Sequence, residues 1–399
     1  NGTPHDQPQQ QFLNYLLRFD ACAANLPRPQ AVCMLFVFPV AMDGQMVAAF
    51  RQHGAEVRSL GASRALSLRS LYAAWRVMRA FQPDIIHSQH AIAGIHARIA
   101  GTVYRVQRAL RRRRVARARR VRIIAEQRNA RHGLSRIART LERLTFPLAG
   151  LILCSSPGVE QSWFGGPAQQ IDPARFNTRR RRHYTFFNSI DIGRLRRSTA
   201  DLDRTAERRR LGLAPGRTAV VTVASLTRQK NYPLLLRAVA ALSAAGSPEP
   251  PPLLLCIGEG GQQPLLRRMI ADLGLQDTVK LLGYRTDIDR VLFACDIFVL
   301  ASRWEGLAKA LLEAMSLGLP CIATAVEGNV DVISHGHDGL LVPSDDAAAL
   351  GHALARLAGD PHYAAALGRR ARQTVERFAV ERQACALLQI YQRLLHYES

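Results

Sequence analysis

Residues 303–339 read RWEGLAKALLEAMSLGLPCIATAVEGNVDVISHGHDG. Apolar residues at helical spacing predict a helix over Leu307–Leu317, which ends at Gly318. Short apolar runs at Ile297–Leu300 and Cys321–Thr324 predict buried strands on either side of it. The order strand, turn, helix, strand is typical of α/β proteins with a parallel sheet.

Two acidic residues stand eight positions apart in this segment, Glu305 in the turn and Glu313 inside the helix. Carboxylates accept hydrogen bonds from hydroxyl groups, and the free amides at a helix start can face a diphosphate. The two carboxylates could therefore contact two ends of one elongated ligand. The alternative is that Glu305 caps the helix and Glu313 is solvated, and short motifs leave both interpretations open.

The segment resembles the donor-binding signature of the family 4 glycosyltransferases, which are retaining enzymes of the GT-B fold. The signature residues are here Glu305, Gly306, Leu307, Glu313, Ala314, Met315, Gly318, Leu319 and Pro320. The resemblance implies that Glu305 contacts the donor sugar and that Glu313 binds the ribose hydroxyls of a nucleotide sugar of the UDP or GDP type. It also implies that the backbone amides of Leu307, Ala308 and Lys309 face the diphosphate.

Three further segments resemble the donor domain of that family. The strand Thr218–Ala224 and its basic loop imply that Lys230 contacts the donor phosphates. Many members carry an arginine where this chain has Ser225, and Arg228 is the available substitute. The resemblance also assigns residues to the floor of the cleft and to the contact with the nucleotide base, namely Gly258, Gly283, Tyr284 and Arg285.

Two Asp-x-Asp patterns occur, at Asp201–Asp203 and at Asp287–Asp289. This pattern binds metal in the other large glycosyltransferase fold, but both copies lie in helix-like surroundings. We interpret both as surface acids. The sequence therefore predicts no metal and no cofactor beyond the nucleotide-sugar substrate.

The first half of the chain resembles the same family more loosely. His87 and His90 follow a predicted strand that ends at the ligand-binding edge of an open α/β sheet, or His87 satisfies backbone groups as a structural residue. Glu126 and Arg128 end the strand Arg122–Ala125, where relatives place a catalytic or sugar-contacting residue. Gly2 and Thr3 would form a turn near the acceptor, and the strand expected before them is absent from the chain.

The resemblance implies a GT-B fold with two Rossmann-like domains that face each other across a cleft. We expect an acceptor-side domain over residues 1–194 that lacks its first strand, and a donor domain over residues 195–373. We expect a C-terminal helix over residues 374–399 to pack back on the first domain. The hinge is expected near residues 188–197.

The formal net charge of the 399 residues is +23, and its location is specific. Arg98–Arg143 holds sixteen Arg and two Glu, and Arg175–Arg197 holds eight Arg and one Asp. Such runs predict contact with an anionic membrane or a lipid-diphosphate acceptor, or they are solvated insertions. Nucleic-acid binding is disfavoured, because the runs lack interleaved aromatic residues and no DNA-binding motif is present.

No run of about twenty apolar residues occurs, so no transmembrane helix is expected. The seven cysteines have no Cys-x-x-Cys spacing and predict buried, reduced thiols rather than a zinc site. They lie at positions 22, 33, 154, 256, 295, 321 and 385. We therefore expect a cytoplasmic protein on the inner face of the plasma membrane.

The expected function is transfer of a sugar from a nucleotide donor to an acceptor, with retention of configuration. By analogy with the family, the acceptor is a lipid-linked intermediate of envelope polysaccharide synthesis. Two alternatives remain open: a catalytically inactive relative that only binds nucleotide sugars, and a GT-B nucleotide-sugar epimerase.

Overall fold

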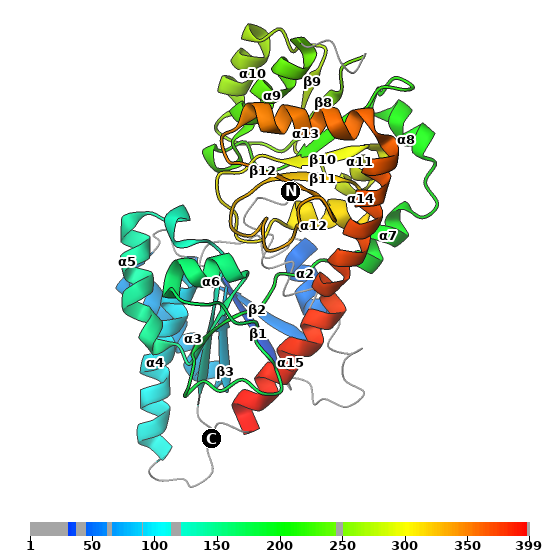
Figure 1. The fold of residues 1–399 in the computed structure, drawn as a ribbon. Helices are drawn as coiled ribbons and strands as arrows, with labels where there is room; N and C mark the ends of the chain where they lie inside the picture. Colours follow the sequence, from blue (N-terminus) through cyan, green and yellow to red (C-terminus); the bar gives the residue numbers. More distant parts are fainter. Residues whose placement is uncertain are drawn as a thin grey trace. The chain divides into compact units, whose positions relative to one another are not determined.

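The computed structural model describes residues 31–36, 45–61, 66–89, 91–112, 121–244 and 250–396. The chain divides into two compact units, which are treated separately here (Figure 1). Unit 1 comprises Asn1–Asn188 together with Val380–Ser399, and unit 2 comprises Ser189–Ala379. The first division thus falls six residues before the position expected from the sequence. The turn predicted at Gly2 and Thr3 lies outside the described residues.

Unit 1 contains two parallel sheets. Strands β1 and β2 form one, and β3, β4, β5 and β6 form the other in that order. Its elements are β1 Val32–Phe36, α2 Gln45–Gln52, β2 Ala55–Ser59, α3 Leu68–Phe81, β3 Ile85–Ser88, α4 Ala91–Arg112, β4 Arg122–Gln127, η1 Arg131–Gly133, α5 Arg136–Thr145, η2 Phe146–Leu148, β5 Leu151–Cys154, α6 Pro157–Phe164, β6 His183–Thr185 and α15 Val380–His396.

Successive residues of β4 and β5 point to opposite faces of the four-stranded sheet. On one face, Ile124, Leu151 and Leu153 pack against Leu387, Leu388 and other apolar side chains of α15. On the other face, Ile123 packs with residues of α3 and α4, and Ile152 packs with residues near α5 and α6. Both faces are thus covered by helices, which explains the nearly continuous apolar sequence of these strands.

The C-terminal helix begins later than the sequence suggested. Residues Val375–Phe378 form a separate 3₁₀ helix, η4, in unit 2, and Ala379 is extended (ψ 136°). The carbonyl of Phe378 accepts a hydrogen bond from the amide of Ile190 at 3.0 Å. This contact diverts the backbone from a continuous helix, so α15 starts only at Val380.

Unit 2 is a six-stranded parallel sheet in the order β12-β11-β10-β7-β8-β9. Helices α9 and α13 contribute to its largest apolar cluster. Its elements are α7 Ile192–Thr199, α8 Arg204–Arg210, β7 Ala219–Val223, η3 Arg228–Lys230, α9 Tyr232–Ala244, β8 Leu253–Ile257, α10 Gln263–Asp272, β9 Val279–Gly283, α11 Ile288–Ala294, β10 Ile297–Leu300, α12 Lys309–Ser316, β11 Cys321–Thr324, β12 Leu340–Val342, α13 Ala347–Gly359, α14 Pro361–Thr374 and η4.

The strand order of unit 2 reverses beside β7. The chain runs from β7 outward to β8 and β9, then returns to place β10 on the other side of β7. Loops that leave the carboxyl ends of two such strands diverge, and ligands bind in the crevice that opens there. The loops after β7 and β10 are the two that the sequence selected.

The loops after β7 and β8 approach each other closely. Gly258 has φ +137°, and a Cβ atom there would lie 2.0 Å from the carbonyl oxygen of Ala224. The Gly258 amide donates to the carbonyl of Gly283 at 2.8 Å, so the turn cannot swing away without losing that bond. Glycine is required at this position.

We predict that Gly258→Ala destabilises unit 2 by about 3 kcal/mol, since it adds a steric clash to an unfavourable φ. The melting temperature should fall by roughly 5–10 °C in differential scanning calorimetry. Gly261→Ala in the same turn is the control, because a Cβ there meets nothing within 4 Å. Equal melting temperatures of the two variants would contradict the prediction.

Candidate active site

Glu305 lies in the loop between β10 and α12, and its side chain is only 5% exposed. Lys230, at the end of η3, donates from Nζ to Glu305 Oε1 at 2.5 Å. The hydroxyl of Ser302 donates to the same oxygen, also at 2.5 Å. A buried carboxylate needs such partners, because desolvation without them is costly. Both contacts fall on Oε1, so neither of them uses Oε2.

The loops after β7 and β10 are joined by further hydrogen bonds. The amide of Arg303 donates to the carbonyl of Gln229 at 2.8 Å, and the Gln229 side chain donates to the carbonyl of Trp304 at 2.9 Å. Asn231, in a left-handed conformation with φ 49°, donates from Nδ2 to Asp345 Oδ1 at 2.8 Å. These contacts hold Lys230 and Glu305 in one arrangement.

Glu313 lies in the second turn of α12, on the same segment. Its side chain is 14% exposed, and its Oε1 lies 3.4 Å from Nζ of Lys309 one turn earlier. Helix α12 has Ala308 as its N-cap and no side-chain capping bond. Glu305 therefore does not cap this helix, and Glu313 is partly rather than fully exposed.

The start of α12 presents backbone amides. Gly306, Leu307 and Ala308 lead into the helix, and no side chain accepts from the first turn. Free amides at a helix N-terminus carry partial positive charge and favour an anion. The side chains of Leu307 and Ala308 are buried, so only their backbone groups are available for such a contact.

A close backbone contact between Gly328 and Gly306, which was not predicted from the sequence, supports this turn. Gly328, in the loop after β11, has φ +82°, and a Cβ there would lie 2.4 Å from the carbonyl oxygen of Gly306. The available signal was the Glu-Gly-Asn run after the strand Cys321–Thr324. Ser302 was also missed, although it precedes Glu305 by only three residues.

The loops after β8 and β9 lie beside each other. Tyr284 is 49% exposed, and its amide lies 3.4 Å from Oε1 of Glu259. Gly283 has φ +68° and ends β9. Because β8 neighbours both β7 and β9, this pair of loops borders the loop that carries Lys230.

The remaining basic candidates of the donor domain differ in their surroundings. Arg285 donates to both carboxylate oxygens of Asp287, at 2.9 and 2.7 Å. Hydrogen bonds from Arg285 and Arg210, which outweigh burial, lower the pKa of Asp287 to about 2. Arg228 is exposed in η3, and Ser225 is half-buried in the same loop. Arg228 is therefore better placed than Arg285 to meet an anionic ligand.

Both Asp-x-Asp patterns serve the protein's own structure. Asp203 caps α8 by accepting from the amide of Thr205, and Asp287 is held by arginines. Within the described ranges, no three His, Cys, Asp or Glu side chains gather in a way that could hold a metal ion.

Unit 1 contains several buried carboxylates, and one of them is the predicted site residue Glu126 at the end of β4. Arg128 donates to its Oε2 from Nε at 2.9 Å and from Nη2 at 2.6 Å. His87 Nε2 lies 3.0 Å from Oε1, and His87 Nδ1 lies 2.6 Å from the hydroxyl of Tyr391 on α15. The structure thus brings together three of the residues predicted for this side and adds Tyr391, which no local pattern indicated.

Burial alone would raise the pKa of Glu126, but the charges and hydrogen bonds of Arg128 and His87 lower it from 4.5 to about 2. The carboxylate is therefore ionised throughout the physiological range. A group of such low basicity is a poor proton acceptor, so the geometry favours a positioning role for Glu126. Gly2, Thr3 and His90, the other residues predicted for the acceptor side, lie outside the described residues.

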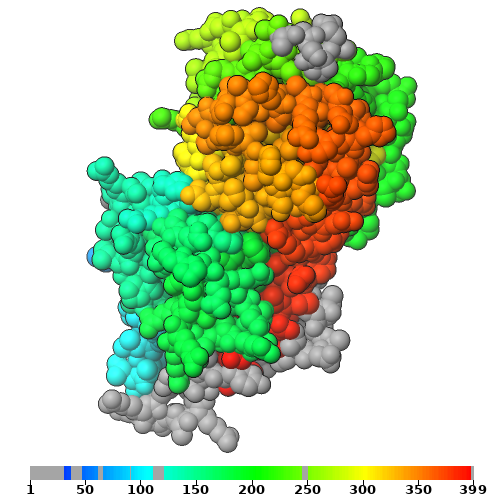
Figure 2. Space-filling view, in the orientation of Figure 1, coloured from blue at the N-terminus to red at the C-terminus, as the bar shows by residue number. Residues whose placement is uncertain are grey.

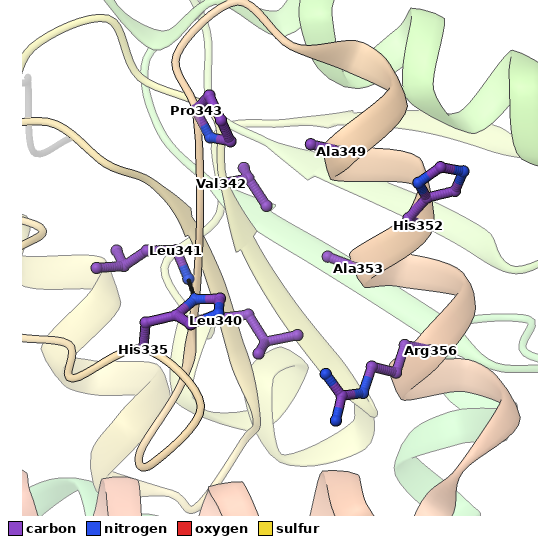
Figure 3. Close-up of a pocket in the computed structure, with 9 residues that line it drawn as sticks. All are labelled: His335, Leu340, Leu341, Val342, Pro343, Ala349, His352, Ala353 and Arg356. Carbon is purple, nitrogen blue, oxygen red and sulfur yellow. Dashed lines mark hydrogen bonds between the residues drawn. The ribbon is translucent and has the colours of Figure 1, made fainter.

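A cavity of about 320 Å³ lies elsewhere in unit 2 (Figure 3). Its lining comes from β12, α13 and the loop that carries His335, whose Nδ1 accepts from the amide of Leu341. None of the predicted donor-site residues lines it. It is therefore separate from the loops after β7 and β10.

The cysteines differ in one respect from the expectation. Cys33, Cys154, Cys256, Cys295 and Cys321 are free thiols, and burial raises the pKa of Cys33 to about 11. Cys385 is disulfide-bonded, so the prediction of reduced thiols throughout is wrong for that residue.

In the part of the chain that the structure describes, no helix has the length and apolar character needed to cross a bilayer.

We predict that Glu126→Gln lowers the free energy of unfolding at pH 7 by about 3 kcal/mol, because it leaves Arg128 without its anionic partner. The depressed pKa contributes stability above the unfolded-state pKa, and this contribution is lost as the pH falls toward 2. The gap between wild type and variant in urea unfolding should therefore shrink between about pH 5 and pH 2.

Glu376→Gln is the control for this comparison. Its half-exposed carboxylate pairs with Arg196 at 2.7 Å on the surface, and such pairs contribute about 0–1 kcal/mol. A gap between wild type and Glu126→Gln that stays constant from pH 7 to pH 3 would show that the carboxylate charge is not responsible.

The second half of the chain is similar to a known protein family. Residues 203–374 match the family "Glycosyl transferases group 1". The chain is 35% identical over 151 residues to the UDP-Gal:alpha-D-GlcNAc-diphosphoundecaprenol alpha-1,3-galactosyltransferase of Escherichia coli. This alignment covers 38% of the chain and 39% of that protein. The chain is 30% identical over 205 residues to the lipopolysaccharide core biosynthesis mannosyltransferase LpsB of Rhizobium meliloti, covering 48% and 56% respectively. The chain thus spans between about two-fifths and three-fifths of the length of these relatives.

Similarity to solved structures extends over nearly the whole chain. Anabaena Alr3699/HepE, solved in complex with UDP and glucose, aligns with a TM-score of 0.72 at 20% identity over 96% of this chain and 94% of that one. The lipopolysaccharide outer core galactosyltransferase WaaB aligns with a TM-score of 0.65 at 17% identity over 98% and 96%. The predicted fold class is confirmed, and residues 203–374 match a glycosyltransferase family, as the sequence predicted for this half of the chain. The chain has the GT-B fold of two Rossmann-like domains, and its residues 203–374 form a domain of the family Glycosyl transferases group 1.

Proposed function

We propose that this protein is a retaining glycosyltransferase of family 4 that uses a nucleotide sugar, of the UDP or GDP type, as donor. The observation that carries the proposal is the Lys230–Glu305–Ser302 cluster at the strand-order reversal of unit 2, followed by Glu313 and the uncapped start of α12. One cation, two carboxylates and a set of backbone amides match the phosphates and hydroxyls of such a donor.

In the proposed reaction, the bond between the anomeric carbon and the donor phosphate oxygen breaks, and a bond to the acceptor oxygen forms on the same face of the sugar. The acceptor proton passes to an oxygen of the leaving phosphate. Lys230 and the amides before α12 stabilise the negative charge that develops on the diphosphate. Arg228 is the nearest additional cation in sequence, and no covalent nucleophile is required.

Glu305 has two tasks in this proposal. Its Oε1 holds Lys230, and its Oε2 accepts from a hydroxyl of the donor sugar. Glu313 accepts from the ribose hydroxyls, while the loop of Gly283, Tyr284 and Arg285 contacts the base through backbone groups. His87, Glu126 and Arg128 are assigned to the acceptor side, with Glu126 orienting the other two.

We further propose a lipid-linked acceptor and a location on the inner face of the plasma membrane. A lipid diphosphate is the acceptor printed in the name of the E. coli relative, and other relatives act in lipopolysaccharide core synthesis. The excess positive charge of unit 1 suits an anionic acceptor or surface. UDP is the favoured nucleotide, because it occurs in the HepE complexes and in the donor name of the E. coli relative.

We expect calorimetry to show that UDP binds the purified chain more tightly than GDP or ADP, and that Glu313→Ala lowers the affinity at least tenfold. Loss of two ribose hydrogen bonds to a carboxylate accounts for such an effect. Glu376→Ala, a surface carboxylate of the same unit, should bind UDP as wild type does. Equal affinity of all three proteins would remove Glu313 from the site, and no binding of any nucleotide would refute the proposal.

We predict that Lys230→Met lowers kcat at least about 100-fold with a smaller change in KM, because the interaction strengthens as the leaving group gains charge. Lys280→Met, an exposed lysine on β9, is the control. Lys230→Arg, which keeps the charge beside Glu305, should fold normally and retain part of the activity. A chain that binds UDP-sugar yet never transfers or hydrolyses it would instead be the inactive relative.

A further inference from the structure

The exposed apolar side chains of unit 1 are concentrated on three consecutive helices. Among the residues that the structure describes, the large apolar side chains of unit 1 with high exposure all lie on α3, α4 or α5. They are Leu68 (86%), Tyr72 (59%), Val103 (52%), Val106 (50%), Leu110 (64%), Ile137 (75%) and Leu144 (70%). Helix α4 contacts both α3 and α5, so the three helices that carry these residues are neighbours in unit 1.

Helix α4 carries apolar residues on its exposed side as well as on its buried side. Its inner side buries Ala97, Ala100 and Tyr104 in the cluster beneath the sheet. Its outer side exposes Val103, Val106 and Leu110, which are three and four residues apart and thus form one stripe along the helix. A helix at a protein surface normally carries polar residues on that outer side. The stripe therefore needs an explanation beyond folding.

The same side of unit 1 is strongly cationic. Helices α3 and α4 contain eight arginines and no acidic residue. Arg98 is buried against Glu142 of α5 at 2.9 Å, and Arg108 pairs with Asp84 at 3.1 Å, so these two arginines are neutralised within the fold. Arg69, Arg76 and Arg79 are exposed on α3, beside Leu68 and Tyr72. Part of α4 forms the cyan surface of unit 1 in Figure 2.

The second basic run, Arg175–Arg197, has a different character. Arg181 donates to the buried Glu160 at 2.5 Å, and Arg196 pairs with Glu376 at 2.7 Å. No large apolar side chain in these described residues is exposed to the same degree. Part of this run is thus used within the fold, and none of it combines charge with exposed apolar area.

We infer that the outer sides of α3, α4 and α5 form the surface by which this protein docks on an anionic lipid bilayer. The inference rests on the membrane location proposed above. It assigns the membrane contact to this surface rather than to Arg175–Arg197. The apolar stripe enters the boundary between headgroups and acyl chains, and the arginines contact lipid phosphates on either side of it. Charge complementarity commits the surface to a bilayer, since exposed apolar side chains next to exposed arginines fit a surface that is anionic outside and apolar within.

The test is sedimentation of the purified full chain with vesicles of phosphatidylcholine, alone or mixed equally with phosphatidylglycerol. Wild type should bind the anionic vesicles at least tenfold more tightly, and high salt should weaken but not abolish this binding. Val103→Gln/Val106→Gln/Leu110→Gln should reduce binding at least tenfold. Leu265→Gln/Leu273→Gln, which changes two exposed leucines in or next to α10 of unit 2, should bind as wild type does.

A second pair of variants separates the two basic runs. Arg69→Gln/Arg76→Gln on α3 should weaken binding to the anionic vesicles several-fold. Arg179→Gln/Arg180→Gln, which removes two equally exposed charges from the other run, should change it little. The opposite ranking would transfer the docking surface to Arg175–Arg197 and overturn the inference.

Further outcomes are equally decisive. The inference fails if the triple variant binds the vesicles like wild type. It also fails if wild type does not bind anionic vesicles. If the triple variant loses only a dimer that wild type forms, the surface serves self-association instead. If the triple variant does not fold, Ile137→Gln/Leu144→Gln provides the same comparison from α5. Affinity for UDP is measured in parallel, because vesicle binding without nucleotide binding would refute the proposed function and leave the docking surface intact.

Discussion

The ion pair between Lys230 and Glu305 joins the two loops that leave the sheet of unit 2 where its strand order reverses. An ionised carboxylate with 5% exposure is stable only beside a cation and a hydrogen-bond donor, which Lys230 and Ser302 supply. The neighbouring backbone bonds of Gln229 and Arg303 lock the same two loops. The chemistry proposed for this protein thus depends on charges that the fold holds in place before any ligand arrives.

Unit 1 also stabilises a buried carboxylate through cationic and hydrogen-bonding neighbours, near the ends of β3 and β4. Glu126 is buried at the end of β4 and is kept ionised by Arg128 and His87. Tyr391 of α15, which lies 304 positions later in the chain, contacts His87. The C-terminal helix therefore has two roles in unit 1: it covers one face of the sheet, and it contributes a side chain to the buried polar cluster.

The arginines of this chain divide into two groups by their surroundings. Arg98, Arg128 and Arg181 each neutralise a buried or nearly buried carboxylate, and these arginines are required by the fold. Arg69, Arg76 and Arg79 lie exposed among apolar side chains of α3. The number of arginines alone does not separate the two groups. Each arginine counts as +1 whether it neutralises a buried carboxylate or lies on the surface.

The sequence by itself determined the strand-turn-helix order around residues 303–339, because that order depends on local periodicity. The GT-B fold followed from the resemblance of the motif residues to a known family, since the motif lies within one contiguous segment. The bounds of β10 and β11 were predicted to the residue from the short apolar runs that form them. Only the tertiary structure decided which side chains meet: Lys230 with Glu305, Asn231 with Asp345, and His87 with Tyr391 lie 75, 114 and 304 positions apart. Contacts across such distances arise from the order of strands in a sheet and from the packing of helices on it, and no local pattern records either one.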